Sequence, residues 1–131
     1  MKRKIIRKGK VLTIHALCND DSPISELEEF LNKINEKDRM MILNKLETAA
    51  NNIYMVRNTN FFKYLDEYLY EFRHKRYRLL TYNESNNVEM EDNKKLVILF
   101  AFIKKSKAEQ NRYINKAKRI IDKIKQEGWN E

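Results

Sequence analysis

The segment LVILFAFI, residues 96–103, is continuously apolar in a chain of 131 residues of which 35% are charged. A short apolar run rich in β-branched and aromatic residues is typical of a strand that is covered on both faces. The segment therefore predicts a central strand around which the rest of the chain packs. The chain is 42% hydrophobic and contains only two glycines and one proline, so we expect a single globular domain over residues 1–131.

The remaining elements are predicted from periodicity and turn signals. In chain order they are a strand at 11–17, a helix starting at Asp21-Ser22-Pro23, a second helix after Asn35, a loop at 51–60, strands at 68–73 and 76–82 about a His74-Lys75 turn, an acidic connection at 83–93, the strand at 96–103, and a helix at 107–126. The order β-α-α-β-β-β-α predicts an α+β fold, in which an N-terminal helix hairpin and a C-terminal helix pack on a small, mostly antiparallel sheet.

Positive charge is concentrated at the two ends of the chain, which has a formal net charge of +8. Residues 1–10 contain several cations and no acid, and are interpreted as a basic, solvated N-terminal tail. The second basic segment is residues 104–125. This charge favours an anionic partner such as nucleic acid, an acidic protein or a membrane surface, although it is equally compatible with simple solubility.

Composition also argues against several classes of protein. The single cysteine, Cys18, has no partner for an internal disulfide, which is typical of a cytoplasmic protein. No segment approaches the roughly 18 apolar residues that span a membrane. His15 and His74 show no metal-ligand spacing, and there is no glycine-rich loop to hold a nucleotide phosphate. We therefore expect no metal, no cofactor and no membrane partner.

The segment FRHKRYRLLTY, residues 72–82, has two interpretations. Its cations could protect a sheet edge from aggregation, or they could form a phosphate site on a rigid sheet. Side-chain alternation and the natural hairpin register bring Glu71, Arg73 and Arg78 together, whereas Lys75 and Arg76 belong to the solvated turn. Cleavage of RNA requires such a mixture, because a base accepts the 2′-OH proton, cations stabilise the phosphorane, and an acid protonates the 5′-oxygen.

Four segments in order then resemble a known family. ALCNDDSPISELEEFLNKI, FFKYLDEYLYEFR, RYRLLTY and LVILFAFIKKS, followed by a basic helix, are similar to the RelE/HigB-type toxins of type II toxin–antitoxin systems, in particular to the phage-derived HigB-like branch. The resemblance covers about Val11 to Ile124 and depends on the order and spacing of the segments. It implies a RelE-like fold and a cytoplasmic, ribosome-dependent endoribonuclease, an mRNA interferase of the hydrolase class.

The resemblance also implies a reaction, partners and roles for individual residues. The RNA's own 2′-OH would attack without a metal, and the partners would be the ribosome, mRNA and a cognate antitoxin of the helix-turn-helix type. Arg78 matches the family's phosphate-stabilising arginine and Arg73 a second cation. The remaining candidates are Lys104 or Lys105 as the acid, Glu71 as the base, and Lys63, Arg76, Tyr82 and Tyr113 as RNA-binding residues.

This sequence departs from the family pattern in three places. Glu71 stands where some RelE toxins carry a lysine, and no histidine follows the last strand as it does in some HigB toxins. The connection at 83–93 is acidic and longer than the usual tight hairpin. ParE-type relatives share the fold but inhibit DNA gyrase, so the fold alone does not decide the target. A gyrase inhibitor and a catalytically inactive RNA- or protein-binding module therefore stay open as alternatives.

Overall fold

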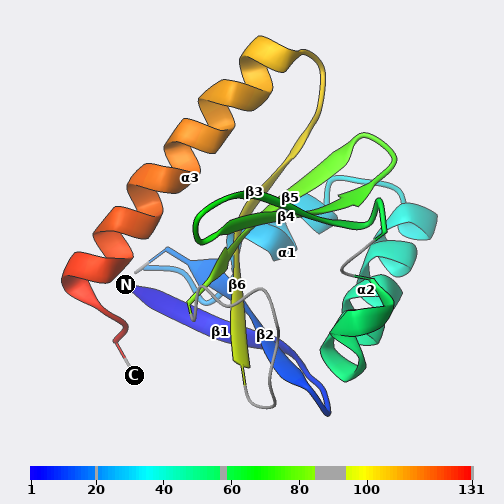
Figure 1. The fold of residues 1–131 in the computed structure, drawn as a ribbon, viewed down its shortest axis with the longest axis horizontal. Helices are drawn as coiled ribbons and strands as arrows, with labels where there is room; N and C mark the ends of the chain where they lie inside the picture. The colour runs from blue at the N-terminus through cyan, green and yellow to red at the C-terminus, as the bar shows by residue number, and fades with distance from the viewer. Residues whose placement is uncertain (20, 57–58, 85–93, 131) are drawn as a thin grey trace.

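The computed structural model describes residues 1–19, 21–56, 59–84 and 94–130. These residues form an α+β fold around one six-stranded, mostly antiparallel sheet with the strand order β1-β2-β6-β5-β4-β3 (Figure 1). In chain order the elements are β1 (Lys2–Lys8), β2 (Leu12–Cys18), α1 (Glu26–Leu31), α2 (Glu36–Asn51), the 3₁₀ turn η1 (Ile53–Met55), β3 (Phe62–Asp66), β4 (Leu69–His74), β5 (Tyr77–Asn83), β6 (Lys94–Ile103) and α3 (Lys107–Glu127).

The predicted central strand is confirmed as β6. It runs parallel to β2 and antiparallel to β5, so it is hydrogen-bonded on both sides. Leu96, Val97, Ile98 and Leu99 are all fully buried. Leu96 and Ile98 belong to one hydrophobic cluster and Val97 and Leu99 to another, because successive side chains point to opposite faces of the sheet. A continuous apolar run is what such a two-sided strand requires.

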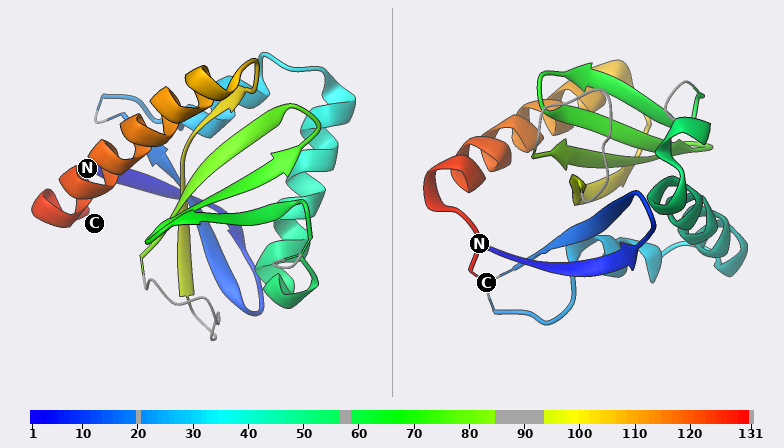
Figure 2. Two further views of the ribbon diagram at one scale, coloured as in Figure 1. Left: turned by 45° about the horizontal axis from the view of Figure 1, so that its top comes forward. Right: turned by 60° about the horizontal axis from the view of Figure 1, so that its bottom comes forward.

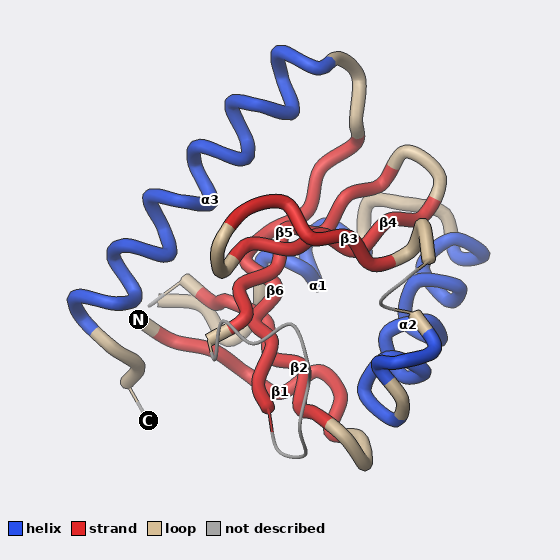
Figure 3. Tube along the Cα trace, viewed as in Figure 1, coloured by secondary structure: helices blue, strands red, loops and turns tan. Residues whose placement is uncertain are grey.

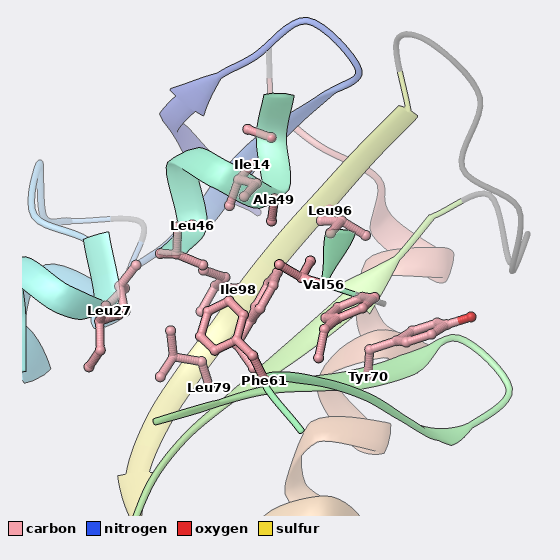
Figure 4. Close-up of a cluster of buried hydrophobic side chains, with 14 of the residues drawn as sticks. Ile14, Leu27, Leu46, Ala49, Val56, Phe61, Tyr70, Leu79, Leu96 and Ile98 are labelled. Atoms are coloured by element: carbon pink, nitrogen blue, oxygen red, sulfur yellow. The ribbon is translucent and has the colours of Figure 1, made fainter. Parts of the chain in front are cut away.

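The first cluster lies between the sheet and α2. Figure 4 shows Leu46 and Ala49 of α2 facing Ile98 of β6, with Leu79 and Phe61 completing the cluster. The second helix was predicted after Asn35, and Asn35 is indeed its N-cap. The Asn35 side chain accepts a hydrogen bond from the Asp38 backbone N–H at 2.8 Å, which satisfies one of the free amides of the first turn.

The second cluster lies beneath α3. Ala117, Ile121 and Ile124 of this amphipathic helix pack on Leu80 and Val97 of the sheet. Figures 2 and 3 show α3 crossing the sheet on the side away from α2. Its predicted bounds, 107–126, agree with the observed Lys107–Glu127 to within one residue. Within the described part of the chain, no helix is both long and apolar enough to cross a membrane.

The prediction of a basic N-terminal tail does not describe residues 2–8, which form the edge strand β1. β1 pairs antiparallel with β2 from Lys2↔Cys18 to Lys8↔Thr13. The start of β1 is held by Arg3, which forms an ion pair with Glu84. The Arg3 guanidinium also lies over the Trp129 ring, 4.6 Å from the ring centroid. Backbone pairing supplies the hydrogen bonds, so the strand needs few apolar side chains, and its exposed lysines suit an unpaired sheet edge.

Like β1, the strand β3 is absent from the prediction. It covers Phe62–Asp66 and pairs antiparallel with β4 from Phe62↔Phe72 to Asp66↔Leu69. The sheet is therefore larger by two edge strands than the predicted one. β3 is only five residues long and has two exposed residues, Lys63 and Tyr64, so its sequence lacks the apolar alternation that identifies a strand.

Two predicted boundaries, the hairpin turn and the start of the first helix, differ from the structure by a few residues. The hairpin turn consists of Lys75 and Arg76, because His74 pairs directly with Tyr77 and Lys75 adopts a positive φ of 54°. The first helix begins after Ser25, whose hydroxyl accepts from the Glu28 N–H at 3.1 Å while the Glu28 carboxylate accepts from the Ser25 N–H at 3.0 Å. This capping box prevails over the predicted start at Asp21-Ser22-Pro23. Residues 85–93 of the predicted acidic connection lie outside the described residues.

Gly9 is required where the turn after β1 meets α2. A Cβ added to Gly9 would lie 2.2 Å from the carbonyl carbon and oxygen of Ala50, and these backbone atoms cannot yield as a flexible side chain would. We expect Gly9→Ala to lower the free energy of unfolding by about 1–3 kcal/mol through overpacking. Urea denaturation measures this, with Lys10→Ala in the same turn as the control, which should change stability by less than about 0.5 kcal/mol.

Candidate functional site

Arg73 and Arg78 lie directly opposite each other on β4 and β5. β4 is hydrogen-bonded to β3 on one side and to β5 on the other, and β5 is flanked by β4 and β6. Neither arginine is therefore on an edge strand, and protection of a sheet edge does not explain them. That explanation suits β1 instead, which is an edge strand rich in lysine and arginine.

The two arginines share one buried acid, Glu71. The Glu71 residue is fully buried, and its Oε1 accepts a hydrogen bond from Arg73 Nε at 2.5 Å. Arg78 Nε lies 3.8 Å from the same oxygen, which is an ion pair but too long for a hydrogen bond. One carboxylate thus faces two guanidinium groups, and the cluster keeps an excess of positive charge.

The arrangement leaves hydrogen-bonding capacity unused. Arg78 is only 9% exposed, and its Nη1 donates to the carbonyl oxygens of Lys75 at 2.7 Å and Tyr77 at 3.0 Å. Arg78 Nε and Glu71 Oε2 are buried and have no hydrogen-bond partner among the described residues. Burial lowers the pKa of the Arg78 guanidinium, and the Glu71 carboxylate opposes this shift. A buried donor without a hydrogen-bond partner is costly, and the nearby Glu71 carboxylate offsets this cost only electrostatically.

An open hollow of about 450 Å³ lies beside the β4–β5 hairpin. Such a volume is in the range of pockets that hold small ligands. It is lined by cationic, neutral polar and aromatic side chains and by no acid: Lys45, Asn60, Phe61, Arg73, His74, Lys75 and Arg78. Two other hollows on the described surface each contain at least one carboxylate in their lining. Its chemistry is suited to an anion such as a phosphate group.

The other predicted cations are near this hollow but do not line it. The Lys104 backbone N–H donates to the Arg76 carbonyl oxygen at 2.7 Å, so the end of β6 is tied to the hairpin turn. Lys105 and Arg76 are exposed. Lys63 is also exposed, at the β3 position paired with Glu71. The role of Lys104 or Lys105 as the acid, and the contact of Arg76 and Lys63 with RNA, stay predictions.

The two predicted tyrosines have structural contacts. Tyr82 is only 6% exposed and packs in the cluster beneath α3, where burial raises the pKa of its phenol. Tyr113 stacks on the Phe102 ring, with 4.3 Å between ring centroids. Tyr82 therefore lies beneath α3 at this end of β5, and its contact with RNA stays a prediction. Tyr113 is half-buried on α3.

A second polar cluster, centred on Asp38, was not predicted. Its Oδ1 lies 3.3 Å from His74 Nε2 and 2.8 Å from Lys75 Nζ. Its Oδ2 accepts from Tyr77 Oη at 3.2 Å, and Lys45 Nζ lies 3.1 Å from His74 Nδ1. Asp38 precedes Ile42 by four residues, so an acid on the apolar stripe of α2 was the signal for this cluster in the sequence.

The ionisation of Asp38 should make the stability of the fold depend on pH. The hydrogen bond from Lys75, then those from Asn35, His74 and Tyr77, lower the pKa of its carboxyl group well below the usual range. The unfolded chain therefore takes up this proton at a higher pH than the folded chain does. The stabilisation is complete above the unfolded pKa, near 3.8, and is lost as the pH falls below it. Urea denaturation at pH 6 and pH 3 should show that Asp38→Asn flattens this decline. An unchanged slope would contradict the assignment.

Within the described residues, no group of three or more His, Cys, Asp or Glu side chains is placed to hold a metal ion. The candidate site consists of the arginine pair with Glu71, the hollow, and the Asp38 cluster.

A scan against protein-family models found no matching family. A search of curated proteins likewise found no similar sequence.

Proposed function

We propose that this chain is the toxin of a type II toxin–antitoxin system, with a RelE-like fold, and that it cleaves mRNA on the ribosome. The observation that carries the proposal is the pair Arg73 and Arg78 on interior strands, held by one buried carboxylate and lining a hollow without acids. Two guanidinium groups face a single carboxylate, so the cluster keeps an excess of positive charge. A phosphate group with growing negative charge is a ligand of complementary charge for this hollow.

The proposed reaction needs only the RNA and protein side chains. The 2′-oxygen attacks the adjacent phosphorus while its proton passes to a base, and the bond from phosphorus to the 5′-oxygen breaks as that oxygen takes a proton from an acid. The products are a 2′,3′-cyclic phosphate and a 5′-hydroxyl. The phosphorane carries more negative charge than the ground state, so fixed guanidinium groups bind it more strongly and thereby accelerate the reaction.

Burial favours separate roles for the clustered residues. Arg78 is held by two carbonyl oxygens and Arg73 by Glu71, so both guanidinium groups are preorganised. Glu71 is completely buried behind them, which favours its orienting the arginines over its acting as the base. Lys104 stays the candidate acid, because the backbone contact with Arg76 brings the end of β6 to the hairpin.

Growth and RNA integrity after brief induction in a bacterium test the proposal. We expect growth arrest together with new mRNA 5′ ends inside translated codons, mapped by primer extension. Arrest with intact mRNA and loss of plasmid supercoiling would instead indicate gyrase inhibition. Unimpaired growth would indicate a binding module without toxicity. If the chain is the toxin of a pair, co-expression with a helix-turn-helix protein encoded by the adjacent gene should restore growth and yield a stable complex.

A further inference from the structure

Asp38, His74 and Lys45 form a chain of polar contacts that ends at the hollow. His74 is 6% exposed and Asp38 is 3% exposed, whereas Lys45 is half-buried and reaches the lining. His74 Nε2 lies 3.3 Å from Asp38 Oδ1, and His74 Nδ1 lies 3.1 Å from Lys45 Nζ. The imidazole therefore connects a buried acid of α2 to a cation at the surface.

The contacts of His74 assign a role to each ring nitrogen. A lysine ammonium group only donates hydrogen bonds, so His74 Nδ1 accepts from Lys45. His74 Nε2 then donates to Asp38. Lys45 Nζ also lies 5.1 Å from the centroid of the Phe61 ring, within cation–π range. Two directional contacts thus hold the Lys45 ammonium group in one place, unlike that of a freely solvated surface lysine.

Lys45 and Arg78 approach the hollow from different sides of the hairpin. His74 pairs with Tyr77, and these residues alternate with the pair Arg73 and Arg78 along β4 and β5. Their side chains therefore leave the sheet on opposite faces. Both sets nevertheless line the same hollow. Cations on two sides of one open hollow are better placed for two phosphates of a strand than for a single one.

We propose that Lys45 binds a second phosphate of a single-stranded RNA, next to the phosphate held by Arg73 and Arg78, and that His74 is the residue that positions it. The inference rests on the proposed function, because it specifies the substrate contact of the same site. His74 acts through Lys45 and does not touch the RNA. The competing interpretation is that the three residues only attach α2 to the hairpin.

Two dinucleotides distinguish these interpretations. The first has one internucleotide phosphate, the second carries an additional 5′-phosphate, and both have a 2′-O-methyl group that blocks cleavage. Binding to the purified full chain is measured by NMR titration at one low salt concentration. In the wild-type protein we expect the additional phosphate to strengthen binding about tenfold, as is typical of one charge-assisted contact. In Lys45→Met the gain should fall below about twofold.

Lys37→Met is the matched control, since Lys37 is an exposed lysine on the same helix. It should retain the full gain. A tenfold gain in Lys45→Met would overturn the proposal, and so would failure of both dinucleotides to bind the wild-type protein. If the control loses the gain as well, the additional phosphate responds to overall charge and the subsite does not exist.

Two substitutions of His74 test its positioning role. In His74→Asn the amide oxygen can replace Nδ1 as the acceptor for Lys45, whereas in His74→Gln the amide group can replace only Nε2, the donor to Asp38. We expect the asparagine variant to keep most of the gain from the additional phosphate and the glutamine variant to lose it. Equal behaviour of both variants, with the gain retained, would show that His74 does not position Lys45.

The same titrations separate this inference from the proposed function. Arg78→Ala should weaken both dinucleotides by the same factor, because each contains the internucleotide phosphate, and should leave the gain from the additional phosphate intact. If the second phosphate depends on Lys45 but cells show no mRNA cleavage, the subsite stands and the proposed activity is wrong. If mRNA is cleaved and Lys45→Met keeps the gain, the activity stands and the subsite is wrong.

Discussion

Arg78→Ala is expected to reduce the rate of mRNA cleavage by a factor of about 10²–10³, the usual cost of removing one preorganised group that stabilises transition-state charge. The guanidinium group is buried, held by two carbonyl oxygens and unsatisfied at Nε, so water cannot replace it at the same position. Arg78→Lys should recover only part of the rate, because an ammonium group lacks the planar fork. Single-turnover cleavage on programmed ribosomes measures both variants.

Arg76→Ala is the control for this experiment. Arg76 is two residues away and carries the same charge, but it is exposed in the hairpin turn. We expect the cleavage rate of Arg76→Ala to fall severalfold at most, because RNA is attracted less strongly. This loss should diminish at higher salt. A rate for Arg78→Ala within threefold of wild type would remove Arg78 from the site. Circular dichroism should show that both variants are folded.

Phe72→Ala is expected to cause the largest loss of stability, about 3–5 kcal/mol of the free energy of unfolding. Phe72 is fully buried, and its ring centroid lies 4.6 Å from that of Phe62 and 5.2 Å from that of Phe61. Truncation would leave a cavity between β3, β4 and the α2 side of the core. Urea or thermal denaturation followed by circular dichroism measures the change.

The position of Phe72 in the chain adds a second consequence. It lies between Glu71 and Arg73, so relaxation of β4 into the cavity should also displace the residues that hold the two arginines. We therefore expect lower cleavage even at temperatures where Phe72→Ala is folded. Met40→Ala, at a side chain that is 55% exposed on α2, should change stability by less than about 0.5 kcal/mol. Comparable losses in the two variants would contradict the placement of the core.

The elements with strong periodicity were predictable from the sequence. The strand β6 and the helices α2 and α3 follow directly from the spacing of apolar residues in their sequences. β1 and β3 were not predictable, because an edge strand gains its hydrogen bonds from its neighbour and needs little apolar surface of its own. Lys2–Lys8 forms a strand because β2 is available to pair with it, and local propensity does not contain that information.

The site was predictable only in part, for a similar reason. Arg73, Arg78 and Glu71 lie close together in sequence, so strand alternation and hairpin register were sufficient to bring them together. Lys45 and Asp38 come from a helix about 30 residues earlier, and only the packing of α2 against the hairpin brings them to His74. Alternation assigns Tyr82 to one face of β5 but does not show that α3 covers that face.

Cleavage of an mRNA bound in the ribosomal decoding site, with and without the 2′-OH at the scissile position, tests the central claim most directly. Wild-type protein should cut the all-ribose mRNA without added metal for catalysis, and leave a 2′,3′-cyclic phosphate and a 5′-hydroxyl. A single 2′-deoxy substitution should abolish that cut, because the attacking oxygen is then missing. Cleavage of the 2′-deoxy mRNA, or a product with a 5′-phosphate, would contradict attack by the 2′-OH at the arginine site.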